Sequence, residues 1–212
     1  SHADAMLEGV TDLSPDGAVK LGFRAHYPQL ETKLTVRGRD PAEIDAKLKP
    51  VEDEVRRRLG NFVLAEDDDT LEGVILKALT ADKALITIVE GFTSGQITAR
   101  IGQLAGAEEV IQRGIVARDY SEICAATGAS PAVMIDGITP ESVAAIAKAA
   151  LRHTRATHSL AVLVDLDPGA DRIEFAGTVC IAIATADGVE TRRSRIVGGR
   201  EWVRLGAIEM GL

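Results

Sequence analysis

A short run of glycine and hydroxyl residues, from Glu90 to Gly95, has the composition of a loop that binds anions. It follows an apolar run that predicts a buried strand and precedes residues that predict a helix. Backbone N–H groups at the start of such a helix attract negative charge, and Thr93 and Ser94 would add hydroxyl donors beside Gly95. The same Gly-x-x-x-Gly spacing is typical of a plain tight turn. The segment therefore predicts either an anion-binding loop or a purely structural turn.

A second candidate is the arginine-rich stretch near the C-terminus, which contains a single acidic residue, Glu201. Its arginines are Arg192, Arg193, Arg195, Arg200 and Arg204. One interpretation is a solvated hairpin and helix face whose charge balances acidic residues elsewhere. The sharper interpretation selects Arg200, which directly follows two glycines at a predicted helix start, as a clamp for an anionic group.

Metal binding is not expected from the acidic or histidine residues. The run from Glu66 to Asp69 is interpreted as a solvated linker that ends in a helix N-cap, with Asp69 and Glu72 at capping-box spacing. Consecutive carboxylates on an exposed turn cannot all face one ion. His153 and His158 lie across a predicted helix end and are expected to cap it or to face solvent. We therefore predict no metal and no cofactor.

Residues 1–65 predict a small α+β module. Apolar runs at residues 19–25 and 31–36 predict a pair of strands joined by a turn that contains proline. His26 falls in this strand region and is expected at a surface or cross-strand position.

One long helix is predicted within the same module. Asp40 and Pro41 supply an N-cap and a first helical residue, and apolar residues follow at helical spacing until Gly60. Pro50 is expected to kink or split this helix, because it lacks the N–H that the helix requires. Residues 61–64 predict a short closing strand.

The remaining residues, 66–212, predict a layered α/β domain with a mixed sheet. Strands are expected at residues 84–89, 114–117, 160–165, 175–184 and 190–197. Helices are expected at residues 71–79, 96–103, 120–127, 140–152 and 200–210, the fourth beginning at Thr139-Pro140. Asp187-Gly188 predicts a two-residue hairpin, which makes one edge of the sheet antiparallel.

Composition excludes several classes of protein. The chain has 212 residues, of which 46% are hydrophobic and 26% charged, which excludes global disorder. A net charge of -8 and 3% aromatic residues argue against binding nucleic acids or anionic membranes. No apolar run approaches the roughly 18 residues that span a bilayer, so we expect a cytoplasmic protein. Cys124 and Cys180 are expected to be buried thiols, and Ser1 to Ala3 to be the remnant of a protease cleavage.

Several short blocks together resemble a known family. The run from Val89 to Gly95, with Ala99-Arg100 and Leu104-Ala105-Gly106, resembles the A-E-S-C-T-G-G, A-x-x and G-x-S region of the CinA C-terminal domain, the nicotinamide mononucleotide deamidase family. Further blocks in the same order are Arg113 to Val116, Gly137 to Ala144, Gly177 to Val179 and Gly199 to Arg204.

The resemblance covers about residues 66–212, and residues 10–65 are similar to the KH-like module that precedes this domain in full-length CinA proteins. It implies an α/β sandwich, a homodimer or larger homo-oligomer, and a molybdopterin-binding-like domain N-terminal to this sequence. The KH-like part lacks a Gly-x-x-Gly loop, since Gly38 is not followed by a second glycine at that spacing. RNA binding is therefore not expected.

The departures from the family pattern affect its catalytic residues. The resemblance implies a serine nucleophile in G-x-S, and a tyrosine and a lysine in Y-S-N-x-x-K that serve hydrolysis of a nicotinamide carboxamide. Glu108 stands where that serine is expected. Aligned without a gap, Arg118 takes the tyrosine position and Ile123 the lysine position, and a two-residue gap would restore Tyr120.

No alignment restores the lysine, because the chain has none between Lys83 and Lys148. Gly91 replaces the serine of A-E-S. The glycine-rich A-G-P-D-G-G loop becomes the acidic segment from Asp165 to Asp171, which would repel a phosphate.

These departures favour a degenerate domain that has lost hydrolysis and acts in ligand binding, oligomerisation or regulation. Two alternatives remain open: an active nicotinamide-nucleotide amidase in which Glu108 activates water beside Thr93 and Arg200, and a binding protein for another nucleotide or acid. A Glu108–Arg118 ion pair filling the emptied site is a further hypothesis.

Overall fold

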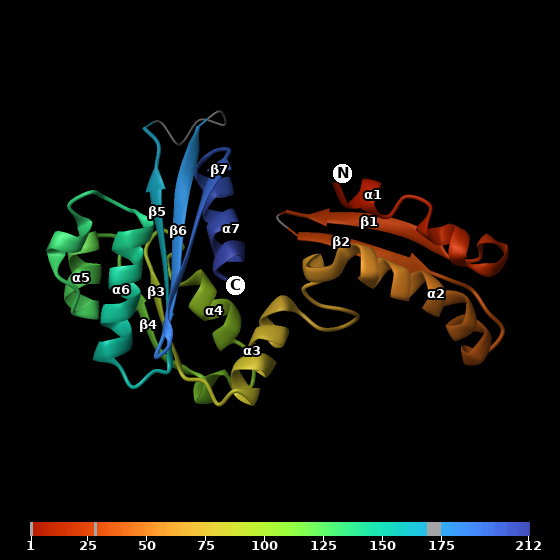
Figure 1. The fold of residues 1–212 in the computed structure, drawn as a ribbon, viewed down its shortest axis with the longest axis horizontal. Helices are drawn as coiled ribbons and strands as arrows, with labels where there is room; N and C mark the ends of the chain where they lie inside the picture. The colour runs from red at the N-terminus through yellow and green to blue at the C-terminus, as the bar shows by residue number, and fades with distance from the viewer. Residues whose placement is uncertain (1, 28, 169–174) are drawn as a thin grey trace. The chain divides into compact units, whose positions relative to one another are not determined.

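The structure, a computed structural model, describes residues 2–27, 29–168 and 175–212 (Figure 1). It divides into two compact units, residues 1–68 and 69–212, where the sequence predicted a boundary after residue 65. None of the helices in the described ranges is long and apolar enough to cross a membrane.

The 1–68 unit is built on one hairpin and one long helix (Figure 1). Strands β1 (Lys20–His26) and β2 (Gln29–Thr35) pair antiparallel, with His26 opposite Gln29 and Lys20 opposite Thr35. Helices α1 (His2–Met6) and α2 (Pro41–Leu59) and the 3-10 helices Val10–Leu13, Pro15–Gly17 and Gly60–Phe62 complete it. The buried core of this unit consists of Leu7, Val10, Val19, Val51 and Val55.

Helix α2 begins where the sequence predicts and continues through its proline. The Asp40 carboxylate accepts a hydrogen bond from the Glu43 N–H at 2.9 Å, and Pro41 occupies the first turn. The expected split at Pro50 is wrong, because α2 runs unbroken to Leu59. Burial of Val51 just after the proline supplies packing that offsets the lost backbone hydrogen bond.

The predicted closing strand at residues 61–64 is also wrong. The chain instead forms the 3-10 helix Gly60–Phe62 and continues without regular structure. Phe62 and Leu64 are 71% and 52% exposed, so no neighbouring strand covers their side chains.

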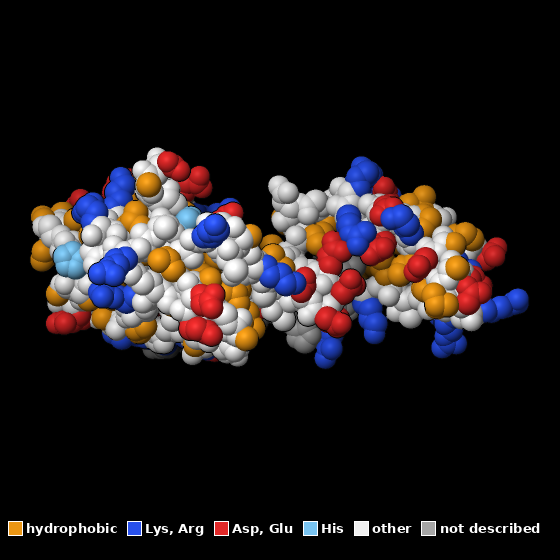
Figure 2. Space-filling model, turned by 90° about the horizontal axis from the view of Figure 1, so that it is seen from below, with side chains coloured by type: hydrophobic (Ala, Val, Ile, Leu, Met, Phe, Trp, Pro, Cys, Tyr) orange, Lys and Arg blue, Asp and Glu red, His pale blue; other side chains and the backbone are white. Residues whose placement is uncertain are grey.

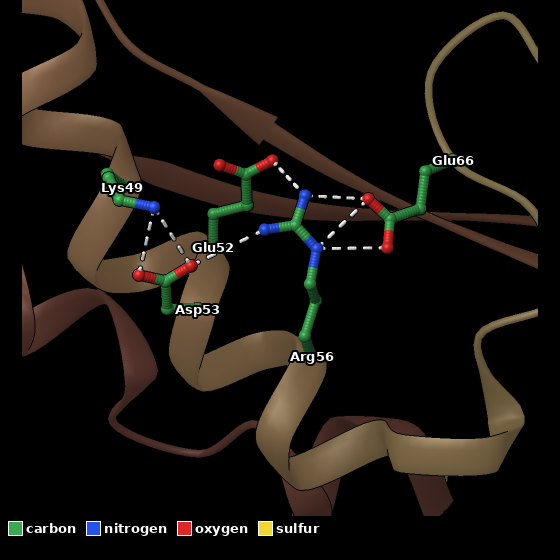
Figure 3. A network of polar contacts seen from close by, with 5 residues as sticks. All are labelled: Lys49, Glu52, Asp53, Arg56 and Glu66. Carbon is green, nitrogen blue, oxygen red and sulfur yellow. Dashed lines mark hydrogen bonds and ion pairs between the residues drawn. The ribbon is translucent and has the colours of Figure 1, made fainter.

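Acidic and basic side chains intermingle on the face of this unit that Figure 2 shows. The best-connected group lies along α2 and is centred on Arg56 (Figure 3). Its guanidinium donates to Glu66 at 2.7 Å and to Glu52 at 2.6 Å, and it also meets Asp53, which pairs with Lys49. These contacts raise the pKa of Arg56 and lower that of Glu66, chiefly through their shared hydrogen bonds. The segment that leaves α2 is therefore tied back to the helix.

The 69–212 unit is a three-layer α/β sandwich. Its strands are β3 (Ile86–Glu90), β4 (Ile111–Val116), β5 (His158–Leu166), β6 (Ala176–Thr185) and β7 (Gly188–Val197), in the order β4-β3-β5-β6-β7. Strand β3 runs parallel to β4 and β5, whereas β6 and β7 are each antiparallel to the preceding strand. The sheet is mixed, as the sequence predicts.

Helices cover both faces of this sheet (Figure 1). Helices α3 (Leu71–Ala81), α4 (Gln96–Gly102) and α7 (Arg200–Gly211) contribute to one apolar core, and α5 (Tyr120–Thr127) and α6 (Pro140–His153) to the other. The 3-10 helices Ala107–Glu109 and Pro131–Met134 lie in the connections. Every helix and strand predicted in this region is present, with ends shifted by a few residues.

Two local predictions in this unit need correction. The N-cap of α3 is Thr70, whose hydroxyl accepts from the Gly73 N–H at 3.1 Å, and not Asp69, which pairs with Lys77. A hydroxyl one residue later thus provides the cap that the carboxylate was expected to provide. In the β6–β7 hairpin, Thr185 pairs with Gly188, so the turn residues lie one position earlier than predicted.

Candidate functional site

The loop after β3 lies at the carboxyl edge of the parallel strands and is organised by a buried carboxylate. Glu90, the last residue of β3, has no exposed surface. Its Oε2 accepts from the Thr93 hydroxyl at 2.7 Å and the Ile97 N–H at 3.1 Å, and its Oε1 accepts from the Thr98 N–H and hydroxyl at 2.9 and 2.8 Å. The strand therefore caps the helix that follows it with its own side chain.

This arrangement occupies donors that an anion would need. The Thr93 hydroxyl is fully buried and already donates to Glu90, as do two amides at the start of α4. The exposed Ser94 donates its hydroxyl to the Phe92 carbonyl at 3.2 Å, and Gly95 has a φ of 83° before the helix begins. The geometry favours the structural-turn alternative for this segment. Glu90 is a residue whose role the sequence reasoning missed, although its place at a strand end before a helix start is a usable signal.

Two arginines from distant parts of the chain meet at the ring of Phe92. The guanidinium carbon of Arg118, in the connection from β4 to α5, lies 5.0 Å from the ring centroid. That of Arg200, the first residue of α7, lies 5.7 Å from the same centroid. The two guanidinium carbons therefore lie within about 11 Å of each other. Phe92 is only 6% exposed, so the ring is a fixed platform for both cations.

Tyr120 follows Arg118 by two residues and begins α5. Its hydroxyl donates to the Val164 carbonyl on β5 at 2.7 Å. The pKa of Tyr120 is raised to about 12, chiefly by burial and also by the charge of Asp165, while the charge of Arg118 opposes the rise. Tyr120, Arg118 and Asp165 thus share one electrostatic environment at the carboxyl edge of the sheet.

The positions at which the A-E-S serine and the Y-S-N-x-x-K lysine are missing are neighbours in space. A Cβ atom added at Gly91 would lie 3.7 Å from Ile123 Cδ1 and 3.4 Å from Leu163 Cδ2. Ile123 and Leu163 are fully buried. The structure therefore places an apolar contact where two polar side chains would otherwise meet.

Glu108 lies at the other edge of the sheet. It belongs to the 3-10 helix that precedes β4, whereas Arg118 follows the end of β4. This strand has 6 residues, so its two ends are about 20 Å apart. The exposed Glu108 carboxylate accepts from the Gly106 N–H at 3.1 Å. The Glu108–Arg118 ion pair is therefore wrong, and Glu108 does not converge with Thr93 and Arg200.

The C-terminal arginines separate into different roles. Arg195 pairs with Asp167 at 2.5 Å and Arg204 with Glu201 at 2.6 Å, so both serve local ion pairs. Arg192 and Arg193 lie exposed on the edge strand β7. Of the five, Arg200 is the arginine that reaches the Phe92 ring. The part of the acidic loop at residues 169–171 lies outside the described residues.

His153 and His158 make local contacts, and both cysteines are buried. His153, at the end of α6, packs so closely on Gly128 that a Cβ there would lie 2.6 Å from its ring nitrogen, and His158 contacts the Thr157 hydroxyl at 2.8 Å. Cys124 and Cys180 are free, buried thiols whose pKa burial raises. Within the described ranges, no group of three His, Cys, Asp or Glu side chains is placed to hold a metal ion.

This geometry defines a layered α/β domain with a candidate site at the carboxyl edge of its parallel strands. The family model of the CinA C-terminal domain matches residues 68–212, and the chain belongs to that family. A CinA-like protein of Frankia casuarinae is 30% identical over 212 residues, covering 99% of this chain and 49% of the relative. A putative competence-damage inducible protein of Desulforamulus reducens is 26% identical and covers 97% and 50%. The chain thus spans about half the length of these curated relatives.

Solved structures agree on the fold. A competence-damaged protein (CinA) superfamily protein of Escherichia coli superposes with a TM-score of 0.59 at 17% identity, covering 72% of this chain and 94% of its own. A competence/damage inducible protein of Agrobacterium tumefaciens gives a TM-score of 0.56 at 20% identity, covering 66% and 88%. At these identities the similarity concerns the fold alone.

Proposed function

We propose that the 69–212 unit is a CinA-family domain that has lost amide hydrolysis and binds an anionic small molecule, such as a nucleotide, at the carboxyl edge of its sheet. The observation that carries the proposal is the contact between the Gly91 and Ile123 positions. Acyl transfer to a serine needs a hydroxyl and a neighbouring base that takes its proton. The serine to which the resemblance gives that role, in G-x-S, is Glu108 here, and Gly91 and Ile123 likewise supply neither a hydroxyl nor an amine.

The surroundings of these two positions support the loss. Leu163 and Ile123 fill the space in front of Gly91, and both are buried. The buried Glu90 carboxylate is not available as a substitute base, because four donors already bind it. Tyr120 retains a hydroxyl, but it donates to a backbone carbonyl and its raised pKa opposes ionisation.

Anion binding is supported by Arg118 and Arg200. Arginine presents its donors in a planar fork that suits carboxylate and phosphate oxygens. Arg118 is exposed, and no carboxylate of the described residues forms an ion pair with it. Both guanidinium groups contact the same Phe92 ring, which brings the two charges into one region of the unit.

The alternative of an active amidase that uses Glu108 as general base lacks a supporting observation. It requires Glu108 beside Thr93 and Arg200, and Glu108 lies at the opposite edge of the sheet. The Thr93 hydroxyl is committed to Glu90.

Ligand binding is tested by calorimetric titration and thermal shift with nicotinamide mononucleotide, and with nicotinamide riboside as the analogue without phosphate. A ligand at 100 times its dissociation constant should stabilise the unit by about 2.7 kcal/mol. Arg118→Gln should weaken binding of the phosphorylated ligand about tenfold or more, because it removes a charged donor.

The matched control is Arg113→Gln, which removes the same charge from an exposed position on β4. This control should leave the affinity unchanged. Equal loss in both variants, or no stabilisation by any phosphorylated ligand in a nucleotide panel, would refute the anion site.

A further inference from the structure

Strand β2 has a sequence that is complementary to itself when it is reversed. It reads Gln29-Leu30-Glu31-Thr32-Lys33-Leu34-Thr35. Two copies that run antiparallel with Thr32 opposite Thr32 would place Leu30 opposite Leu34 and Glu31 opposite Lys33. Each leucine would then meet a leucine, and each charge would meet its opposite, on both sides of the two-fold axis.

The backbone of β2 is oriented for this pairing. In an antiparallel ladder, residues alternate between those that exchange hydrogen bonds with the neighbouring strand and those whose N–H and C=O point away. His26 is opposite Gln29, and residues that close a two-residue hairpin loop form a hydrogen-bonded pair. The residues whose backbone N–H and C=O groups point away from β1 are therefore Leu30, Thr32 and Leu34. These are the residues that exchange hydrogen bonds when two β2 strands pair around Thr32.

The outer edge of β2 has no strand beside it among the described residues, since β1 and β2 form a sheet of two strands. The free edge of a sheet is a site for pairing with another strand. Leu30 is 40% exposed, and Glu31 and Lys33 are exposed as well.

We propose that the edge of β2 is a homodimerisation surface, on which a second copy of this chain adds its own β2 antiparallel around Thr32 to make one four-stranded sheet. The contact is isologous, because the same strand serves both copies. Main-chain hydrogen bonds supply the attraction, and the side-chain pairs fix the register. This inference is independent of the proposed ligand site.

Each face of the four-stranded sheet would carry the same kind of side chains in both copies. Leu30, Thr32 and Leu34 share the face that bears Leu21, which packs against the core of the unit. Leu30 of one copy would thus be covered by Leu34 of the other. Glu31 and Lys33 share the opposite, solvent face. A carboxylate accepts several hydrogen bonds, so Glu31 can meet Lys33 of the second copy whatever it contacts in its own hairpin.

Strand β1 does not offer the same complementarity. Reversal about its central residue, Phe23, would place Arg24 opposite Gly22 and leave the charge without a counterpart. The side-chain pattern therefore selects the β2 edge.

Cysteine cross-linking of the full chain tests the register. In the proposed dimer the two Thr32 Cα atoms are about 5.5 Å apart, which a disulfide spans. The two Lys33 Cα atoms are about 8 Å apart, because they are offset along the strands, and this is too far. Under mild oxidation Thr32→Cys should form a covalent dimer and Lys33→Cys should not. The native cysteines are buried, so cross-linking of the wild-type chain gives the background level. Equal cross-linking of both variants, or none, overturns the proposal.

Sedimentation equilibrium of the full chain tests the edge itself. Thr32→Pro removes an N–H that points out of the hairpin, so it should abolish dimerisation and leave the fold intact by circular dichroism. Ala25→Pro makes the same change on the outer side of β1 and should leave the dimer unchanged. Lys33→Glu and Glu31→Lys should each raise the dimer dissociation constant about tenfold, and an equimolar mixture of these two variants should associate more tightly than either alone.

A wild-type chain that stays monomeric at every concentration overturns the proposal, as would be expected if a strand of a different protein occupied this edge. A dimer that tolerates Thr32→Pro also overturns it.

Discussion

Replacing Glu90 by alanine should destabilise the 69–212 unit strongly, because this one carboxylate ties the end of β3 to the start of α4. Its two oxygens accept hydrogen bonds from the amides of Ile97 and Thr98 and from the hydroxyls of Thr93 and Thr98. The side chain is fully buried, so water cannot take over these contacts without an opening of the loop.

The size of the effect follows from the groups left without a partner. The two hydroxyls can rotate toward other acceptors, but the two amides cannot. Each unsatisfied buried amide costs about 1–3 kcal/mol, and the lost packing adds about 1 kcal/mol. Removing a buried charge recovers part of this cost. We expect a net loss of about 3 kcal/mol for Glu90→Ala.

Urea denaturation followed by circular dichroism measures this loss, and hydrogen exchange at the Ile97 and Thr98 amides locates it. Glu90→Gln should fall between alanine and wild type, because its NH2 group would face donors on one side. The control is Glu109→Ala, which alters an exposed carboxylate and should change stability by less than about 0.5 kcal/mol. Wild-type stability in Glu90→Gln, or unchanged protection of the two amides in Glu90→Ala, would refute the structural role of this carboxylate.

Three further predictions test other contacts of the same unit. The pKa of Tyr120 is raised from 10.0 to about 12, chiefly by burial, so the unfolded chain releases this proton first as the pH rises. The free energy of unfolding should therefore fall between about pH 10 and 12. Tyr120→Phe should remove that pH dependence in urea titrations, and its persistence would contradict the prediction. Arg100→Ala should lower the free energy of unfolding by about 3 kcal/mol in the same assay, because the largely buried carboxylates of Glu72 and Glu209 both pair with this guanidinium. A loss below about 1 kcal/mol would contradict this prediction. Gly128→Ala should lower the melting temperature, because φ is 73° there and a Cβ would collide with a histidine ring; an unchanged melting temperature would show that the α5 terminus does not need glycine.

Much of the fold follows from local sequence patterns. Strand β5 is buried along most of its length and appears in the sequence as a continuous apolar run, and α6 has both its predicted cap and an apolar stripe. Pro50 and residues 61–64 show the limit of such patterns. In the first case packing of the next helical turn outweighs a local preference, and in the second no neighbouring strand exists to pair with.

The site was less predictable, because its residues come together only through the topology of the sheet. The sequence indicates Arg118 and Arg200 separately, but nothing local indicates that both contact one phenylalanine ring. Glu108 was assigned to the site by alignment with a short motif, and the parallel β3–β4 connection carries it to the opposite edge. Conversely, Gly91 and Ile123 were noted as separate departures, and their contact is visible only in three dimensions.

The central claim is that hydrolysis has been lost with the family's serine and lysine, at whose positions this chain carries Glu108 and Ile123, with Gly91 beside Ile123. Its most direct test is incubation of nicotinamide mononucleotide with a high concentration of the full chain, followed by chromatographic separation of the amide from its acid and by an ammonia assay. The account predicts no acid and no ammonia above a protein-free control. Acid formed in stoichiometric excess over the protein, together with an equal amount of ammonia, would contradict it.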